Sequence, residues 1–364
     1  MEIEREWNMH NIRTDLAMEA KEMYVQETNE DIDGVKIVEK KEDGMKISTI
    51  HVKEPAASKI NKKSGTYITV HTKSVIQSDA NKQLETAKII SKQLNELLIS
   101  HEIEKDATCL VIGLGNWNIT PDALGPMAID KLLVTNHLFL IDDETLHEGY
   151  RRVAAMSPGV MGTTGMETSD IVLSVIERLK PDFVIVVDAL ASKSVERINE
   201  TIQITDTGIH PGSGVGNKRK ELSKEVLNIP VFAIGVPTVV DAVTIVHDTM
   251  NEILKNLGRE AKEKGRPKSS LLPNILPIQH ENLTESDLPN EKDRKKYFGM
   301  IGALSDDEKR AFLREILTPS GKNLIVTPKE VDQYMEDMAH LLAQAINACL
   351  HEKVKLKKAT NYTK

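Results

Sequence analysis

Phe183-Val184-Ile185-Val186-Val187 is apolar at every position and runs directly into Asp188. A strand with no polar face is typical of parallel sheets that helices cover on both sides. An acid at the carboxyl end of such a strand faces the crevice in which open α/β sheets bind ligands. An ionised side chain there needs partners or a task that offsets its desolvation. We therefore expect Asp188 to belong to a functional site.

A second acid, Asp122, follows the apolar run from Thr108 to Gly115 in a similar way. In Thr120-Pro121-Asp122 the threonine can cap a helix, the proline suits its first position, and the acid falls in its first turn. Asp122 then either complements the helix dipole or faces Asp188 across the crevice, and the sequence leaves both interpretations open. Two carboxylates close together tend to share one proton, which supplies an acid and a base for attack of water on an amide.

The rest of the chain alternates between apolar runs and helical periodicity, which predicts an α/β fold with a mainly parallel central sheet flanked by helices. Alternating residues around Asp43-Gly44 predict an additional hairpin. The core of the fold covers about 80–257. The segment 258–330 interrupts the alternation of strands and helices, so we expect an insertion that serves as a lid or an oligomer contact. A last helix at 328–350 should pack back on the core. The expected strands of the core are 108–113, 183–187, 201–204 and 231–235. The expected helices are 121–133, 171–179 and one that begins at Pro237.

Composition and short motifs argue against several classes of function for this chain. The net charge of -8 disfavours a direct grip on nucleic acid, which requires clustered Lys and Arg. No apolar stretch is long enough to span a membrane, and the two cysteines fit no zinc or redox spacing, so we expect a cytoplasmic protein without metal or cofactor. The turn at 113–118 lacks the third glycine of a dinucleotide site, where Asn118 stands. A serine nucleophile elbow is also missing.

Glycine-rich turns offer backbone amides that can bind an oxyanion or an extended peptide. Asn116 lies in the first such turn and Gly159 in the second, within 157–165. The third turn, 208–217, contains His210, Gly212 and Gly214. The simpler alternatives are tight connections that need glycine, and for His210 an ordinary surface side chain.

Four motifs in this order resemble the spore germination protease family. They are Gly113-Leu114-Gly115-Asn116-Trp117-Asn118-Ile119-Thr120-Pro121-Asp122, the segment from Pro158 to Thr168, Asp188-Ala189-Leu190-Ala191, and the segment from His210 to Arg219. The resemblance spans nearly the whole chain. More distantly, the turn at 113–116 is similar to that of hydrogenase-maturation peptidases, which suggests a shared scaffold.

The resemblance implies an endopeptidase that starts the breakdown of small acid-soluble proteins on spore DNA. Asp122 and Asp188 match the family's catalytic pair. It further implies a homotetrameric zymogen in the spore core that removes its own leader, residues 1–15, by cutting between Asp15 and Leu16, which leaves 16–364 as the protease. From the residues alone, the same stretch is a helix entry with Asp15 as its cap. Which aspartate is the general base stays open.

Two alternatives remain beside this interpretation. One is a peptidase that probes nickel on its substrate, as in hydrogenase maturation. The other is a protein that binds peptides in the same crevice without cutting them.

Overall fold

The computed structural model describes residues 14–28, 32–141, 148–210, 220–262, 283–317 and 324–356. The chain divides into two compact units. One consists of Ile12–Val240 and Thr327–Lys364, and the other includes Asp241–Val326. Both predicted acids, Asp122 and Asp188, lie in the first unit.

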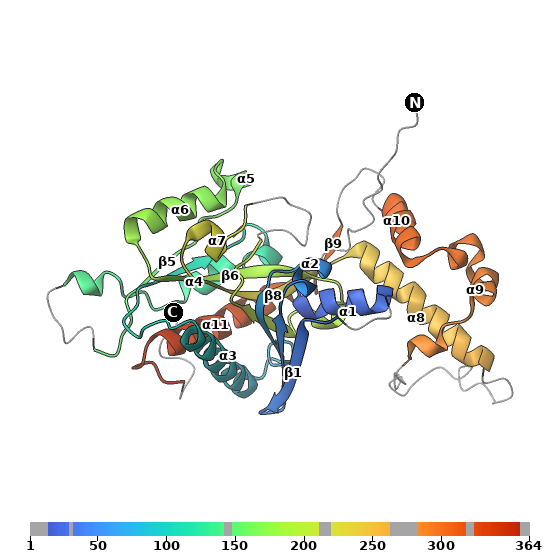
Figure 1. The fold of residues 1–364 in the computed structure, drawn as a ribbon, viewed down its shortest axis with the longest axis horizontal. Helices are drawn as coiled ribbons and strands as arrows, with labels where there is room; N and C mark the ends of the chain where they lie inside the picture. The colour runs from blue at the N-terminus through green and yellow to red at the C-terminus, as the bar shows by residue number, and fades with distance from the viewer. Residues whose placement is uncertain are drawn as a thin grey trace. The chain divides into compact units, whose positions relative to one another are not determined.

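A mixed sheet forms the centre of the first unit, with strands in the order β1-β2-β3-β7-β8-β6-β4-β5 (Figure 1). Within it β5, β4, β6 and β8 pair in parallel, whereas β1, β2, β3 and β7 pair antiparallel with their neighbours. The bounds of these strands are β1 Val35–Glu42, β2 Met45–Val52, β3 Gly65–His71, β4 Cys109–Gly113, β5 Val153–Met156, β6 Phe183–Ser192, β7 Thr201–Thr205 and β8 Val231–Asp241.

Helices cover both faces of this sheet. Figure 1 shows α3 and α11 on one face of the sheet and α6 and α7 on the other. Residues of α3 and α11 cluster with Ile185 and Val187, and residues of α6 and α7 cluster with Val184 and Val186. The predicted burial of 183–187 on both sides is therefore confirmed. The helices of this unit are α1 Ala17–Thr28, α2 Ala56–Lys59, α3 Ala80–Ser100, α4 Leu124–Asp130, α5 Met161–Thr164, α6 Thr168–Leu179, α7 Lys224–Leu227 and α11 Val331–Leu350.

The sheet is mixed, so the expectation of a mainly parallel sheet is not confirmed. The central sheet with flanking helices is confirmed, and so is the hairpin, whose strands pair around Asp43 and Gly44 with φ angles of +49° and +78°. The difference arises at β7, which pairs antiparallel with both β3 and β8 and so joins the hairpin to the parallel strands. Apolar composition reveals burial but not strand direction. The relation to hydrogenase-maturation peptidases stays a prediction.

Three element boundaries also differ from those expected. β6 continues through Asp188 to Ser192, so the acid lies within the strand and not at its end. β8 continues through Pro237 to Asp241, and the next helix begins at Ala242, because a run of β-branched residues extends the strand. The expected helix over 121–133 is divided into a 3-10 turn, η1 (Thr120–Asp122), and α4.

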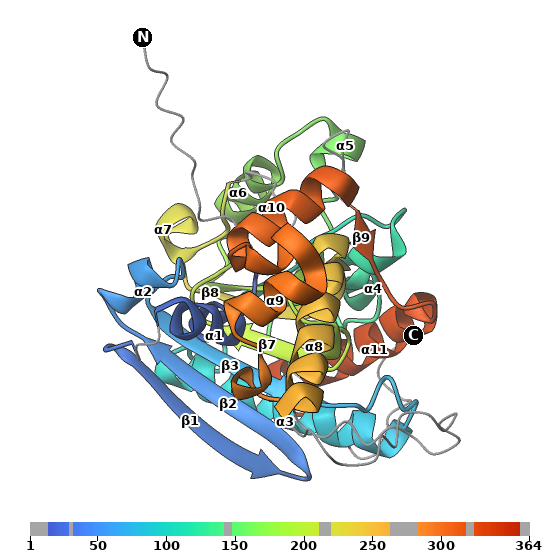
Figure 2. The same cartoon turned by 90° about the vertical axis from the view of Figure 1, so that its right-hand side faces the viewer.

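The second unit is mostly helical in its described residues. It contains α8 (Ala242–Lys262), α9 (Glu291–Phe298), α10 (Asp306–Leu317) and the short strand β9 (Ile325–Val326) (Figure 2). The predicted insertion at 258–330 and its role as a lid or oligomer contact stay predictions. Within the described segments, no helix has both the length and the apolar character needed to cross a bilayer.

Candidate active site

Asp188 is buried in the strand β6, with 5% of its surface exposed. Its Oδ1 accepts a hydrogen bond of 2.9 Å from the backbone N–H of Ala189. Across the sheet Asp188 is paired with Gly235 of β8, and Gly235 is in turn paired with Gln203 of β7. Because residues that lie opposite one another share a face, the side chains of Gln203 and Asp188 stand in one row.

Asp122 lies on a turn that makes hydrogen bonds on both sides of β6. On the β4 side its carbonyl accepts from the N–H of Asn116 at 3.0 Å. On the β8 side the hydroxyl of Thr238 donates to the carbonyl of Pro121 at 2.6 Å. Since β6 lies between β4 and β8 in the sheet, the turn crosses β6, and η1 contacts that strand.

Two glycines allow this close approach. A Cβ at Gly115, which has φ of +120°, would lie 1.9 Å from the carbonyl oxygen of Asp122. A Cβ at Gly125 would lie 2.6 Å from the carbonyl oxygen of Val187, the residue before Asp188. The structure therefore brings the turn of Asp122 and the strand of Asp188 together at one end of the sheet. That the carboxyl groups of Asp122 and Asp188 face one another stays a prediction.

The remaining predicted loop residues differ in position. Asn116 belongs to the same turn as Asp122, and its Oδ1 accepts from the N–H of Asn118 at 3.0 Å. Gly159, with φ of +74°, follows β5, whose loop is tied to β4 where the hydroxyl of Ser157 donates to the carbonyl of Gly113 at 3.1 Å. Both loops follow the carboxyl ends of neighbouring parallel strands.

The third predicted loop is only partly described. His210 lies 2.7 Å from a carboxylate oxygen of Glu221, and its side chain is 52% exposed. Burial lowers the pKa of this histidine, although Glu221 opposes that shift. Gly212 and Gly214 fall outside the described residues. The position of His210 fits a loop side chain with its own acidic partner.

The Asp15–Leu16 bond lies beside the carboxyl end of β6, three residues beyond Asp188. The Asp15 carboxylate accepts from the N–H of Ala191 at 3.0 Å, and Leu16 is 0% exposed. The side-chain amide of Gln203 spans the bond: it donates to the Asp15 carbonyl at 3.2 Å and accepts from the N–H of Ala17 at 2.9 Å. Gln203 was not among the predicted site residues. Its signal was a long polar side chain between Ile202 and Ile204 at the centre of an expected strand, and it is 5% exposed.

Comparison with known proteins identifies the family to which these features belong. The sequence model described as germination protease matches residues 13–363. The chain belongs to the germination protease family. The germination protease of Oceanobacillus iheyensis is 54% identical over 358 residues, which cover 97% of this chain and 98% of the relative. That of Priestia megaterium is 51% identical over 369 residues and covers 100% of both chains.

Membership of the germination protease family confirms the resemblance that the motifs indicated. It makes the chain a peptidase of spore germination that acts on a protein substrate. The matched region includes the Asp122 turn, β6 and the segment at Asp15.

Replacing Thr238 with valine tests how the Asp122 turn is held. Thr238→Val keeps the shape of the side chain but leaves the Pro121 carbonyl without its 2.6 Å donor. We expect the free energy of unfolding to fall by about 1–3 kcal/mol in a urea titration, and the peptidase activity to fall with it. Thr69→Val is the matched control, because the buried Thr69 hydroxyl has no hydrogen-bond partner among the residues that the structure describes. Equal effects of the two substitutions would contradict this account.

Proposed function

We propose that the chain is an endopeptidase in which Asp122 and Asp188 activate a water molecule. Its proposed substrates are small acid-soluble DNA-binding spore proteins, cut in the spore core during germination by a homotetramer of this chain. The observation that carries the proposal is the fastening of the Asp122 turn across β6, the strand that contains Asp188. Membership of the germination protease family supports the peptidase class.

Two carboxyl groups at one site suit hydrolysis of an amide. One carboxylate removes a proton from water, and the water oxygen attacks the carbonyl carbon of the substrate. The other carboxyl group, protonated, gives its proton to the amide nitrogen as the C–N bond breaks. The products are a new carboxylate and a new amine. Either aspartate can fill either role in this scheme.

Stabilisation of the oxyanion is the second requirement of the reaction. The loops at Asn116 and Gly159 follow adjacent parallel strands at the same sheet edge. Preorganised backbone N–H donors contribute several kcal/mol when they point at the developing charge. We assign the oxyanion donors to these two loops.

The chain is also its own proposed substrate. Cleavage between Asp15 and Leu16 would remove residues 1–15 and convert a zymogen into the active protease. The row of Gln203, Gly235 and Asp188 supports this, because the side chain of Gln203 holds both sides of that bond. Two ionised aspartates near one another lack a proton to donate, so we propose that acidification starts the reaction by supplying one.

Mass spectrometry of the full-length protein tests the self-processing. We expect an intact N-terminus near neutral pH and loss of residues 1–15 after acidification. An N-terminus that stays intact after acid exposure contradicts self-processing.

A synthetic peptide that contains Glu-Ile-Ala-Ser-Glu tests the endopeptidase. We expect the processed chain to cut it after the first glutamate, with a rate that a metal chelator leaves unchanged. Inhibition by the chelator would favour the nickel-probing alternative, and binding of the peptide without a cut would favour the non-catalytic one.

A further inference from the structure

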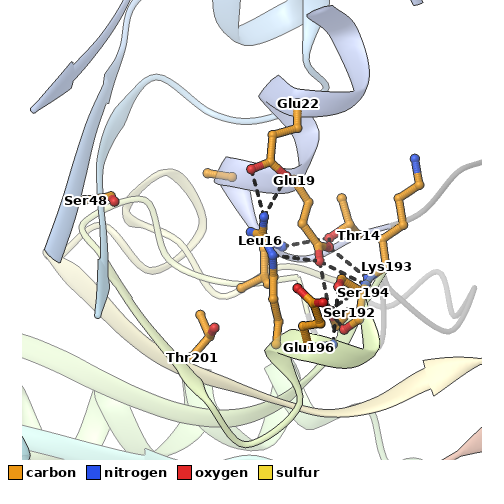
Figure 3. Close-up of polar contacts among 12 residues, drawn as sticks. Thr14, Leu16, Glu19, Glu22, Ser48, Ser192, Lys193, Ser194, Glu196 and Thr201 are labelled. Carbon is orange, nitrogen blue, oxygen red and sulfur yellow. Dashed lines mark hydrogen bonds and ion pairs between the residues drawn. The ribbon is translucent and has the colours of Figure 1, made fainter. Parts of the chain in front are cut away.

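Glu19 is a charged residue buried in the first turn of α1, with 3% of its surface exposed. Its carboxylate accepts three hydrogen bonds from the last residue of β6 and the loop that follows it, and Figure 3 shows them converging on it. The donors are the Ser192 hydroxyl at 2.8 Å, the Lys193 N–H at 2.9 Å and the Ser194 N–H at 3.2 Å. The first donor comes only four residues after Asp188 in the chain.

The same carboxylate is linked to the nitrogen of Leu16 through one hydroxyl group. The N–H of Leu16 donates to the Oγ1 of Thr14 at 3.1 Å, and the Thr14 hydroxyl donates to the Oε2 of Glu19 (Figure 3). Leu16 is the residue before α1, and its carbonyl accepts the helical bond from Ala20 at 3.1 Å. The Thr14 hydroxyl therefore lies between the backbone nitrogen of Leu16 and the carboxylate of Glu19, the third residue of the helix.

In a capping box, the side chain at the third helical position reaches back to the backbone nitrogen of the residue that precedes the helix. Leu16 and Glu19 occupy these two positions. Direct contact between them is thus ordinary helix geometry, and the Thr14 hydroxyl now occupies the space in between.

We propose that Glu19 is the binding site for the α-ammonium group that forms at Leu16 when the Asp15–Leu16 bond is hydrolysed. The inference rests on the proposed self-processing for the origin of that group. Addition of water leaves a carboxylate on Asp15 and an ammonium on Leu16. Thr14 departs with residues 1–15, so Glu19 loses a donor and the Leu16 nitrogen loses its acceptor at the same moment.

Charge makes this pairing necessary. A new cation at Leu16 lies at the positive end of the α1 dipole, and Leu16 is 0% exposed. The acid that now precedes it, Asp15, leaves with the leader. Glu19 remains within capping-box reach of the new ammonium, and the three donors from 192–194 keep its carboxylate oriented.

Two further cations face Glu19. The Nε of Arg197 lies 3.6 Å from it, but the Nη2 of Arg197 pairs with Glu22 at 2.6 Å, so two acids share this cation. Lys62 donates to the Thr14 carbonyl at 2.8 Å and loses this acceptor when the leader leaves. Arg197 and Lys62 together match the charges of Glu19 and Glu22, so the capping-box position of Glu19, and not a surplus of acids, assigns the new ammonium to it.

The test uses a chain that begins at Leu16 with a free amine, made by removing a cleavable N-terminal fusion partner. The amine is treated with an acylating reagent near neutral pH, and its modification is followed by peptide mass spectrometry. An ion pair keeps the amine protonated and unreactive, so we expect Glu19→Gln to be acylated at least about tenfold faster than the unsubstituted chain. Glu22→Gln is the matched control, since Glu22 also pairs with Arg197, and it should react like the unsubstituted chain.

Equal acylation rates in the Glu19→Gln and unsubstituted chains would overturn the inference. A second measurement does not depend on how the variant folds: in the unsubstituted chain the amine should react at least about tenfold faster in urea than in the folded state. Equal rates in those two conditions would also overturn it. Because the fusion supplies the free amine, a full-length chain that fails to cut itself would refute the proposed self-processing without affecting this measurement.

Discussion

Asp188→Asn should abolish peptide cleavage while the protein stays folded. Asparagine has nearly the same shape, and its Oδ1 can still accept the 2.9 Å hydrogen bond from Ala189. It cannot take up or release the proton that hydrolysis requires. General acid–base catalysis contributes about 10²–10⁴ in rate, or about 3–5 kcal/mol, so a loss of at least this size is expected in a peptide assay. Asp122→Asn should cause a loss of the same order.

Asp182→Asn is the matched control for this prediction. Asp182 stands at the other end of β6, where its carboxylate accepts from the N–H of Thr108 at 2.6 Å, and asparagine can accept there too. Its activity should stay close to that of the unsubstituted chain. Full activity in Asp188→Asn or Asp122→Asn would remove that residue from the mechanism, and a thermal melt of each variant would show that its fold is retained.

Gly115→Ala should have the second-largest effect, because it displaces the Asp122 turn. The added Cβ would meet the Asp122 carbonyl oxygen at 1.9 Å, and the φ of +120° is unfavourable for alanine. Backbone strain of this kind costs about 1–3 kcal/mol of stability. A catalytic group moved by about 1 Å can lose 10²-fold in rate, so activity should fall about that far.

Gly162→Ala separates this effect from the general effect of removing a glycine. Gly162 is exposed in α5, and no atom of the described segments lies within 4 Å of the position that its Cβ would take. Alanine is also the better helix former, so stability should be equal or slightly higher. Urea titration and the peptide assay on both variants check the pair. Normal activity in Gly115→Ala would mean that the turn does not hold Asp122 in place.

Local patterns were enough to predict the parts of the fold that depend on burial. The apolar run 183–187 indicated a strand covered on both faces, and Asp43-Gly44 indicated the hairpin turn. Strand direction was not predictable in this way, because β7 is buried whether it runs parallel or antiparallel to β8. The predicted start of the next helix at Pro237 was wrong. A proline suits a helix start, but here the β-branched residues around it continue β8.

The sequence could indicate candidate site residues only where an acidic side chain lies in or directly after an apolar run. Asp122 and Asp188 each follow or lie in an apolar run, which gave their sequence signal. Gln203 and the Glu19 carboxylate bind partners more than 170 residues away, at Asp15 and at 192–194, so the local sequence could not reveal these contacts. Glu19 resembled an ordinary acid of a first helical turn, and only the tertiary structure shows that it holds the loop after β6.

Burial of the Asp15–Leu16 bond limits when the proposed self-cleavage can occur, independently of the residues that would catalyse it. Leu16 is 0% exposed, so its peptide bond meets a hydrolytic water only after the surrounding segment opens locally. If the chain processes itself as proposed, the speed of maturation is the chemical rate multiplied by the population of the opened form. Solvent conditions that favour opening would then hasten the proposed maturation without altering Asp122 or Asp188, and the stability of this short segment would set its time course.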